Sequence, residues 1–533
     1  MRTLRNLILL CSMIITCAAA GQEVHVHFDK PHYFAGEYLF YSLTFSDISA
    51  DSSCIAQIEL GNTGAQIDRH FAQILEGKSA GYVKIPYDIS SEVYFFSIDL
   101  FDNSGAKFQI LQTAISVYNP EAAEWLEEQV VASQQQEADR TFGSLSITYA
   151  EEPYRTRQRV KCIIQAENAS DLSISIRDKV LYPVGDKQYS HDKFEPVTDQ
   201  YLNTIPIHGK RTAPAHIVWN PLLFVANAPT LEFEICMVGK DSFFQVGMPA
   251  FYGRQHIDFI DYVWDDIEIK LMTSTRSYPS ETLQVTTPIL DQIKLYEQRK
   301  KIYRIYNTVE QTPMDEEMEP TTIAIEPDYQ LNVPDFAIQG TVLNLFKELL
   351  APLKFRKGKD GMQQARMVYN ADDGTHFYNS TTKFLVNGHL TRDGDFISQI
   401  PLQEVAFITI YHELDKVRSH FGPIGTGGIV VIEMKDKTYS LPADIRMPSH
   451  PVQGLQEPID YPIKVEQDAG GPQLKSLIYW QPSIRTNDQG RHEFEFVTSD
   501  DLSTFEIEVL AKDHTGKVTL NHRIYEVSSI NAN

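Results

Sequence analysis

The chain has 533 residues, and its 71 acidic against 47 basic side chains give a formal net charge of −24 at pH 7. Such a surface repels nucleic-acid phosphates and anionic lipids, so we expect no nucleic acid among its partners. A hydrophobic content of 42% is ample for ordinary cores, and this length predicts about three to five domains.

Residues 1–20 have the pattern of a secretory signal peptide. Two arginines precede an apolar core from Leu7 to Ile15, and Ala18 to Ala20 supply small residues for cleavage. The core is too short to span a membrane, and no other stretch approaches about 18 uninterrupted apolar residues. We therefore expect an exported protein with no transmembrane segment after signal removal, either periplasmic or associated with the outer membrane. A lipid anchor at Cys17 is the alternative, although Thr16 is not the small residue expected before a lipidated cysteine.

Three cysteines follow the signal: Cys54, Cys162 and Cys236. Their odd number and wide spacing favour buried thiols, and a disulfide between two of them is the alternative.

The first predicted domain covers residues 21–118. His25 and His27 alternate with apolar residues at the period of a half-buried strand. The pair suggests metal ligands, but no third ligand lies nearby in the sequence, so we expect both histidines to face solvent and to bind no metal.

A short motif follows this strand, Asp29-Lys30-Pro31-x-Tyr33-x-x-Gly36-Glu37. It resembles the opening of a macroglobulin-like domain in bacterial α2-macroglobulins and in related envelope proteins of Bacteroidetes. The resemblance implies an immunoglobulin-like β-sandwich of about 100 residues.

The middle of the chain predicts a helical linker at 119–142, a second β-sandwich at 143–272, and a helix with an acidic linker at 273–326. The basic residues near the end of that helix are most simply a solvated face. They are Arg299, Lys300, Lys301 and Arg304.

Residues 327–437 predict a small α+β domain. An apolar run ends at Asn387-Gly388, a pair that favours a tight hairpin turn, and two further β-rich runs begin at Val405 and Ile429. The series LVNG, IPLQEVAFITI and FGPIGTGGIVVIEMK resembles the plug domain of TonB-dependent outer-membrane receptors, with Asn387 in place of the usual Asp. Too few residues follow Lys437 for a receptor barrel, so we expect a free-standing plug-like domain.

The pattern also predicts the interior of this domain. Its expected core residues are Phe384, Val386, Val405, Phe407, Ile408, Ile429, Val431 and Ile432. We expect Lys416 in a solvated loop, and Gly425 to Gly428 to serve chain geometry.

The last segments are a tether at 438–475, rich in proline and glycine, and a C-terminal β-domain at 476–533. The domain's Tyr479-Trp480-x-Pro482 and Asn487-Asp488-x-Gly490 resemble a segment of macroglobulin-type proteins. The predicted fold class is therefore mainly β and multidomain, with macroglobulin-type β-sandwiches and one α+β domain.

No motif in the sequence carries a catalytic mechanism. His412-Glu413 begins like a zinc-protease helix, but Lys416 stands where the second histidine is needed. The loop at Gly425 precedes a strand and offers no phosphate cradle at a helix N-terminus. The Cys-Gly-Glu-Gln thioester of α2-macroglobulins is absent too. We expect no enzyme, and no catalytic, cofactor-binding or metal site.

The sequence thus favours a non-enzymatic exported scaffold or interaction protein of the cell envelope. Its plug-like domain would dock to an outer-membrane or periplasmic partner, for example a barrel or an energy-transducing protein. One alternative is a glycan- or peptide-binding accessory protein of an uptake system, for which exposed aromatic residues would be the mark. Another is an unrecognised hydrolase whose residues meet only in the fold.

Overall fold

The computed structural model describes residues 22–45, 53–122, 144–149, 154–183, 189–194, 202–212, 222–227, 230, 232–261, 267–272, 276–306, 325–349, 352–358, 361–371, 374–421, 425–467 and 472–529. The expected signal peptide, including Cys17, lies outside these residues. Strands dominate and helices are few, so the prediction of a mainly β, multidomain protein is confirmed. Within the described ranges, no helix combines the length and apolar character needed to cross a membrane.

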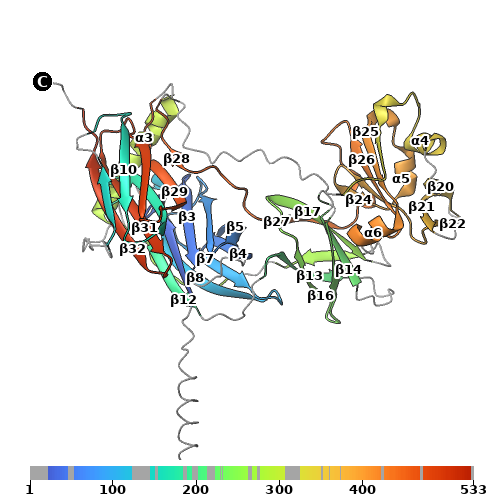
Figure 1. Cartoon of the computed structure of the whole chain (residues 1–533), viewed down its shortest axis with the longest axis horizontal. Coiled ribbons are helices and arrows are strands. Elements are labelled where there is room, and N and C mark those ends of the chain that lie inside the picture. Colours follow the sequence, from blue (N-terminus) through green and yellow to red (C-terminus); the bar gives the residue numbers. More distant parts are fainter. Residues whose placement is uncertain are drawn as a thin grey trace, which may run out of the picture. The chain divides into compact units, whose positions relative to one another are not determined.

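The chain forms two compact units, each assembled from segments far apart in the sequence. Unit 1 comprises Met1–Asn203, Arg276–Glu316 and Leu455–Asn533, and unit 2 comprises Thr204–Thr275 and Glu317–Gly454. Figure 1 shows this division, because the blue, teal and red segments share unit 1 with the yellow-green helix of residues 287–306, while other green to orange segments form unit 2.

The first sandwich of unit 1 holds the strands that directly follow residue 21. They are β1 (Gln22–Phe28), β2 (Tyr33–Phe34), β3 (Tyr38–Phe45), β4 (Ser53–Gly61), β5 (Gln66–Leu75), β6 (Lys78–Lys84), β7 (Glu92–Phe101), β8 (Lys107–Tyr118) and a later strand, β12 (Tyr189–Phe194). Their hydrogen-bonded order is β12-β1-β3-β6-β5-β4-β7-β8-β2. Because β5 and β6 share only the pair Leu75–Lys78, the sheet folds there into two layers. Inward rings of the two layers meet in one core, where Phe28 lies edge-on to Phe96 at 5.1 Å.

The second sandwich of unit 1 combines strands from the middle and the end of the chain. One sheet has the order β30-β10-β9, with β9 (Ser146–Tyr149), β10 (Arg159–Gln165) and β30 (Arg491–Val497). The other has the order β28-β29-β11-β31-β32, with β11 (Ser170–Asp178), β28 (Ile463–Lys464), β29 (Leu477–Arg485), β31 (Thr504–Asp513) and β32 (Val518–Glu526). A single core that includes Cys162, Ile176 and Phe505 lies between the sheets.

This arrangement corrects two expected domains. The range 143–272 is not one sandwich, because β9 to β11 join the C-terminal strands, β12 joins the first sandwich and the rest belongs to unit 2. Residues 476–533 are not a separate domain either, since β30 pairs with β10 and β31 with β11. Alternating apolar residues specify which face of a strand is buried, but they do not identify its partner strand.

The helix α3 (Thr287–Tyr306) lies in unit 1, where its residues Leu290, Ile293 and Tyr296 pack on both sandwiches. The linker expected at 119–142 is described only at its start, where η1 (Pro120–Ala122) is a single 3-10 turn.

Unit 2 begins with a smaller sandwich. Its sheets have the orders β16-β13-β18 and β15-β14-β17-β27. The strands are β13 (Ile205–Thr212), β14 (Leu222–Asn227), β15 (Glu232–Met237), β16 (Phe243–Met248), β17 (Arg254–Asp261), β18 (Glu268–Leu271) and β27 (Ser449–Gln453). β27 and β28 both come from the stretch expected to be a tether, so this stretch contributes one strand to each unit.

The α+β domain of unit 2 has a mixed sheet of order β19-β25-β26-β23-β24 and a small sheet of order β20-β21-β22. The strands are β19 (Tyr329–Asn332), β20 (Leu353–Lys357), β21 (Gln363–Ala371), β22 (Gly374–Phe377), β23 (Lys383–Val386), β24 (His389–Thr391), β25 (Val405–Tyr411) and β26 (Ile429–Met434). The helices are α4 (Val342–Glu348), α5 (Gly394–Gln399) and α6 (Leu414–Phe421), with 3-10 turns η2 (Val333–Asp335), η3 (Leu402–Glu404) and η5 (Ala443–Ile445). The predicted turn joins β23 to β24, and Asn387 and Gly388 have φ angles of 44° and 82°.

Six of the eight predicted core residues of this domain are buried, but Phe407 is 38% exposed and Val431 only partly buried. The domain is also not bounded by polar loops alone. Leu385, Tyr411 and Ile429 lie on the sheet face opposite the main core and pack against Phe224 and Ile260 of the smaller sandwich. The expectation of a free-standing domain is therefore wrong at this face.

Candidate functional site: buried ion-pair networks of unit 1

The motif that begins at Asp29 folds into a compact polar turn between β1 and β3. The Asp29 carboxylate accepts hydrogen bonds from the Tyr33 hydroxyl at 2.7 Å and from the Phe40 amide at 2.9 Å. The Glu37 carboxylate accepts the Phe34 amide at 2.8 Å. Burial raises the pKa of Asp29 in spite of the nearby Lys30 ammonium. The motif residues thus satisfy one another locally.

The same turn also contacts the second sandwich. Lys30 Nζ lies 3.1 Å from Glu37 Oε1 and above the ring of Tyr182, whose hydroxyl donates to the same carboxylate. The Ser175 hydroxyl of β11 donates to the Asp29 carbonyl at 2.7 Å. The motif therefore joins segments about 150 residues apart in sequence.

A second network lies where β1 faces β11 and β31. His27 places Nδ1 2.8 Å from the Ser173 hydroxyl and Nε2 3.0 Å from Glu508 Oε1, and its ring lies against Trp480. Arg177 pairs with Glu506 and, at 3.5 Å, with Glu508.

The expectation that His25 and His27 face solvent is wrong, since both side chains are buried. The covering surface comes from Tyr189 on β12 for His25 and from the second sandwich for His27. The alternation of polar and apolar residues along β1 does not show that these distant segments cover its polar face. Burial lowers the pKa of His25 to about 4, so its ring is neutral at pH 7. Among the described residues, no three His, Cys, Asp or Glu side chains are grouped to hold a metal ion.

The basic face expected on α3 is only partly solvated. Arg299, whose side chain is 11% exposed, lies 2.8 Å from Asp178 and 3.7 Å from Asp501, which belong to the second sandwich. Burial raises the pKa of Asp501 to about 6 against the opposing effect of Arg299. The helix α3 therefore contacts the second sandwich through ion pairs as well as through its apolar face.

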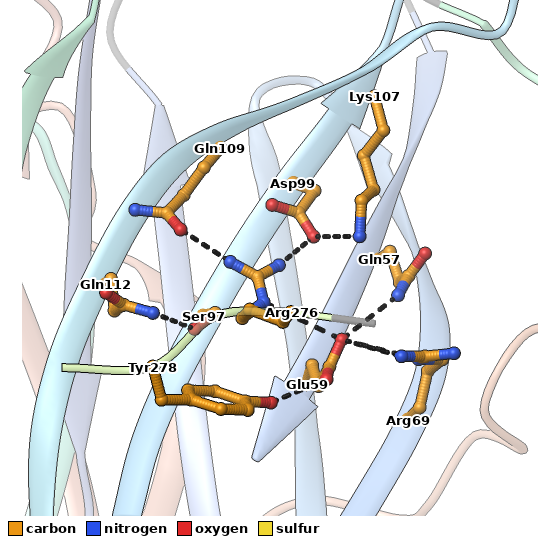
Figure 2. Close-up of polar contacts among 10 residues, drawn as sticks. All are labelled: Gln57, Glu59, Arg69, Ser97, Asp99, Lys107, Gln109, Gln112, Arg276 and Tyr278. Carbon is orange, nitrogen blue, oxygen red and sulfur yellow. Dashed lines mark hydrogen bonds and ion pairs between the residues drawn. The ribbon is translucent and has the colours of Figure 1, made fainter. Parts of the chain in front are cut away.

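A third network lies on the outer face of the first sandwich (Figure 2). Glu59 on β4 and Asp99 on β7 point away from the core, yet each is only 1% exposed. Each carboxylate has a basic partner from the same sheet. Arg69 Nη2 lies 3.2 Å from Glu59, and Lys107 Nζ lies 3.4 Å from Asp99. We call this surface, with Gln57, Ser97 and Gln109, the acidic groove.

The acidic groove is covered by residues 276–278, which we call the strap (Figure 2). Arg276 donates to Asp99 and, at 2.5 Å, to Gln109, and its Nε lies 3.7 Å from Glu59. The Tyr278 hydroxyl donates to Glu59 at 2.5 Å, and burial together with this bond raises its pKa. The groove cannot be predicted from the sequence, because a polar residue at every second strand position normally indicates a solvated face.

The residues considered for chemistry have structural contacts. His412 Nδ1 lies 3.1 Å from the Val368 carbonyl and its ring stacks on Tyr329. The His412 and Glu413 amides donate to the Asp328 carboxylate, which also pairs with Lys416. These contacts position the start of α6. They do not place a nucleophile beside a base.

The glycine loop before β26 has a steric function. Gly427 and Gly428 have φ angles of 115° and 75°, and a Cβ at Gly427 would lie 2.4 Å from the Thr381 carbonyl oxygen.

The cysteines Cys54, Cys162 and Cys236 are free and buried, so the interpretation of buried thiols is confirmed over the disulfide. Burial raises the pKa of each thiol to about 12. Such thiols are poor nucleophiles at neutral pH.

Comparisons with known proteins give a distant likeness only. No family model matches the chain, and no curated protein matches it. Among solved structures it is similar to native Escherichia coli α2-macroglobulin, at 8% identity and a TM-score of 0.25, over 96% of this chain and 40% of that one. Methylamine-reacted Salmonella α2-macroglobulin gives 8% identity and a TM-score of 0.24, again over 96% of this chain and 40% of the other.

A tetra-tandem repeat from the extending region of a large adhesion protein aligns at 10% identity and a TM-score of 0.15, over 94% of this chain and 98% of the repeat. The chain spans about 40% of the macroglobulin structures it matches. Scores this low carry no argument about function, and the resemblance to receptor plug domains remains a prediction.

Proposed function

We propose that this is a non-enzymatic, exported scaffold of the cell envelope, in which unit 1 is a rigid support and the plug-like domain of unit 2 docks to an outer-membrane or periplasmic partner. The observation that carries the proposal is the use of the buried charges of unit 1. Arg177 and Arg299 pair with carboxylates of segments distant in sequence. Lys30 pairs with the nearby Glu37 and also lies above the ring of Tyr182, about 150 residues away. Networks of this kind favour a single arrangement of the parts they join.

The plug-like domain offers surface for a partner. Its exposed large apolar side chains are Tyr329, Leu349, Met362, Phe377 and Phe407. Tyr329 and Phe407 belong to adjacent strands, β19 and β25, and β19 is the edge of its sheet. An edge strand with apolar neighbours suits recognition of an extended segment of a partner.

A glycan-binding role has less support. Exposed aromatic rings are present, but Phe377 and Tyr87 each already hold a cation over one face, from Arg356 and Lys300. Each of these two rings therefore has at most one face left for stacking against a sugar.

Site-specific photo-crosslinking in the native host tests the proposal. A photoreactive residue at Phe407 should give a discrete adduct in the envelope fraction, whereas the same residue at Leu502, an exposed position of unit 1, should give none. Export is measured by fractionating the cells. A folded, exported protein that forms no adduct from Phe407 or Phe377 would contradict the docking role, and retention in the cytoplasm would contradict export.

A further inference from the structure

The strap is bound through side chains, and its backbone belongs to no strand of the sheet below it. Residues 276–278 have no helix or strand assignment. In extended chain, residues i and i+2 point to the same side. This places Arg276 and Tyr278 against the sheet (Figure 2). Ser277 between them is exposed.

The acidic groove does not need the strap for charge balance. Glu59 retains Arg69, and Asp99 retains Lys107, when Arg276 is left out. The two carboxylates and two cations of the sheet neutralise one another, and the strap adds a third cation. Uncovering a paired carboxylate returns it to water, which costs far less than leaving it buried without a partner.

The groove also has a fitted position for the tyrosine ring. Tyr278 stacks on Phe95 with ring centroids 6.1 Å apart and an interplanar angle of 25°. Beside it, Gly61 leaves the necessary space, because a Cβ there would lie 2.7 Å from the Tyr278 hydroxyl. The Arg276 guanidinium thus contacts Asp99, and the hydroxyl and the ring of Tyr278 contact Glu59 and Phe95.

From this geometry we propose that the outer face of β4, β7 and β8 is a recognition groove for a polypeptide segment of the form Arg-x-Tyr, and that the strap occupies it as an exchangeable internal ligand. A partner segment of the same chemistry binds when the strap leaves. The guanidinium provides the charged contact with Asp99, and the tyrosine provides the hydroxyl contact with Glu59 and the stacking on Phe95.

The test uses the full chain with the double substitution Arg276→Ala and Tyr278→Ala. The probe is an acetylated, fluorescently labelled peptide with the sequence of residues 273–281, and binding is measured by fluorescence anisotropy. We expect saturable binding to the double variant and at least about tenfold weaker binding to the unsubstituted chain, because a tethered strap competes at high effective concentration. A peptide with alanine in place of its arginine should not bind, and added salt should weaken binding of the parent peptide.

Two controls make the result decisive. Near-ultraviolet circular dichroism and thermal unfolding establish that the double variant is folded, and Glu59→Gln in the double-variant background should weaken peptide binding several-fold. A folded double variant that binds no peptide would overturn the proposal. A double variant that does not fold would also overturn it, because the strap would then be an integral part of the sandwich.

Discussion

At the residue scale, Lys416 shows how an apparently solvated charge acquires a structural role. Its ammonium pairs with Asp328, which is 3% exposed and also accepts the His412 and Glu413 amides. Burial acts to raise the pKa of Asp328, but Lys416 and the two amides outweigh it and hold the pKa below its usual range. The carboxylate is therefore ionised at neutral pH, and Lys416 is its cation.

We expect Lys416→Ala to lower the free energy of unfolding by about 1 kcal/mol, because it removes the partner of a buried carboxylate while the lysine itself is partly exposed. Lys437→Ala is the matched control, since Lys437 is 72% exposed in its pair with Glu433, and should change stability by less than about 0.5 kcal/mol. Urea unfolding measures both. Equal effects of the two substitutions would show that the Asp328 pair contributes nothing particular to stability.

At the element scale, α3 joins the two sandwiches of unit 1. Tyr296 stacks on Phe34 of the motif turn with centroids 4.2 Å apart, and Tyr182 and Leu181 of the second sandwich complete the same cluster. Arg299, one turn further along, reaches Asp178. One face of a single helix thus contacts both sandwiches.

Tyr296→Ala should therefore destabilise unit 1 by about 3 kcal/mol, the usual effect of deleting a buried aromatic side chain. The control is Ile302→Ala on the same helix, where the side chain is 39% exposed and the loss should stay below about 1 kcal/mol. Thermal unfolding followed by circular dichroism gives both values. If both variants have the same melting temperature as the unsubstituted chain, α3 does not stabilise the sandwiches.

At the scale of the whole molecule, the two units have separate cores, so calorimetry should resolve two unfolding transitions. Asp258 lies in unit 2, and its titration allows the unfolding of that unit to be followed. Its carboxyl group is buried on β17, and burial raises its pKa to about 7 against the opposing hydrogen bonds from Ser449 and the Leu390 backbone and the charge of Arg446. Between about pH 4 and pH 7 the folded state binds this proton more tightly than the unfolded state. The contribution of Asp258 to stability therefore falls as pH rises through this window, and the penalty is complete above pH 7.

Asp258→Asn removes the buried charge but retains an acceptor oxygen. At pH 8 it should raise the melting temperature of one transition. The gain in the free energy of unfolding has an upper bound of about 4 kcal/mol, because each pKa unit corresponds to about 1.4 kcal/mol. At pH 4 the substitution should have little effect.

The second transition should respond to Tyr296→Ala and not to Asp258→Asn. Asp444→Asn, at an exposed position, serves as the control. A single transition that both variants shift would contradict independent units.

The sequence by itself determined the local structure of this protein. Runs of β-forming residues located the strands β25 and β26, and Asn387-Gly388 located a hairpin, because each depends on residues adjacent in the chain. Burial of the three cysteines followed from composition and spacing. The motif from Asp29 to Glu37 was identified in the sequence by its resemblance to the opening of a macroglobulin-like domain, and in the structure its residues bond to one another across a single turn.

Only the tertiary structure decided which strands share a sandwich and which polar faces are covered. β10 pairs with β30 more than 300 residues later, and periodicity carries no information about a partner at that distance. Glu59 and Asp99 have the sequence pattern of a solvated face, yet a segment about 200 residues away buries them. His27 is buried for the same reason, by Ser173 and Glu508. Local pattern determines which side of a strand is polar, whereas distant chain segments determine whether that side meets water.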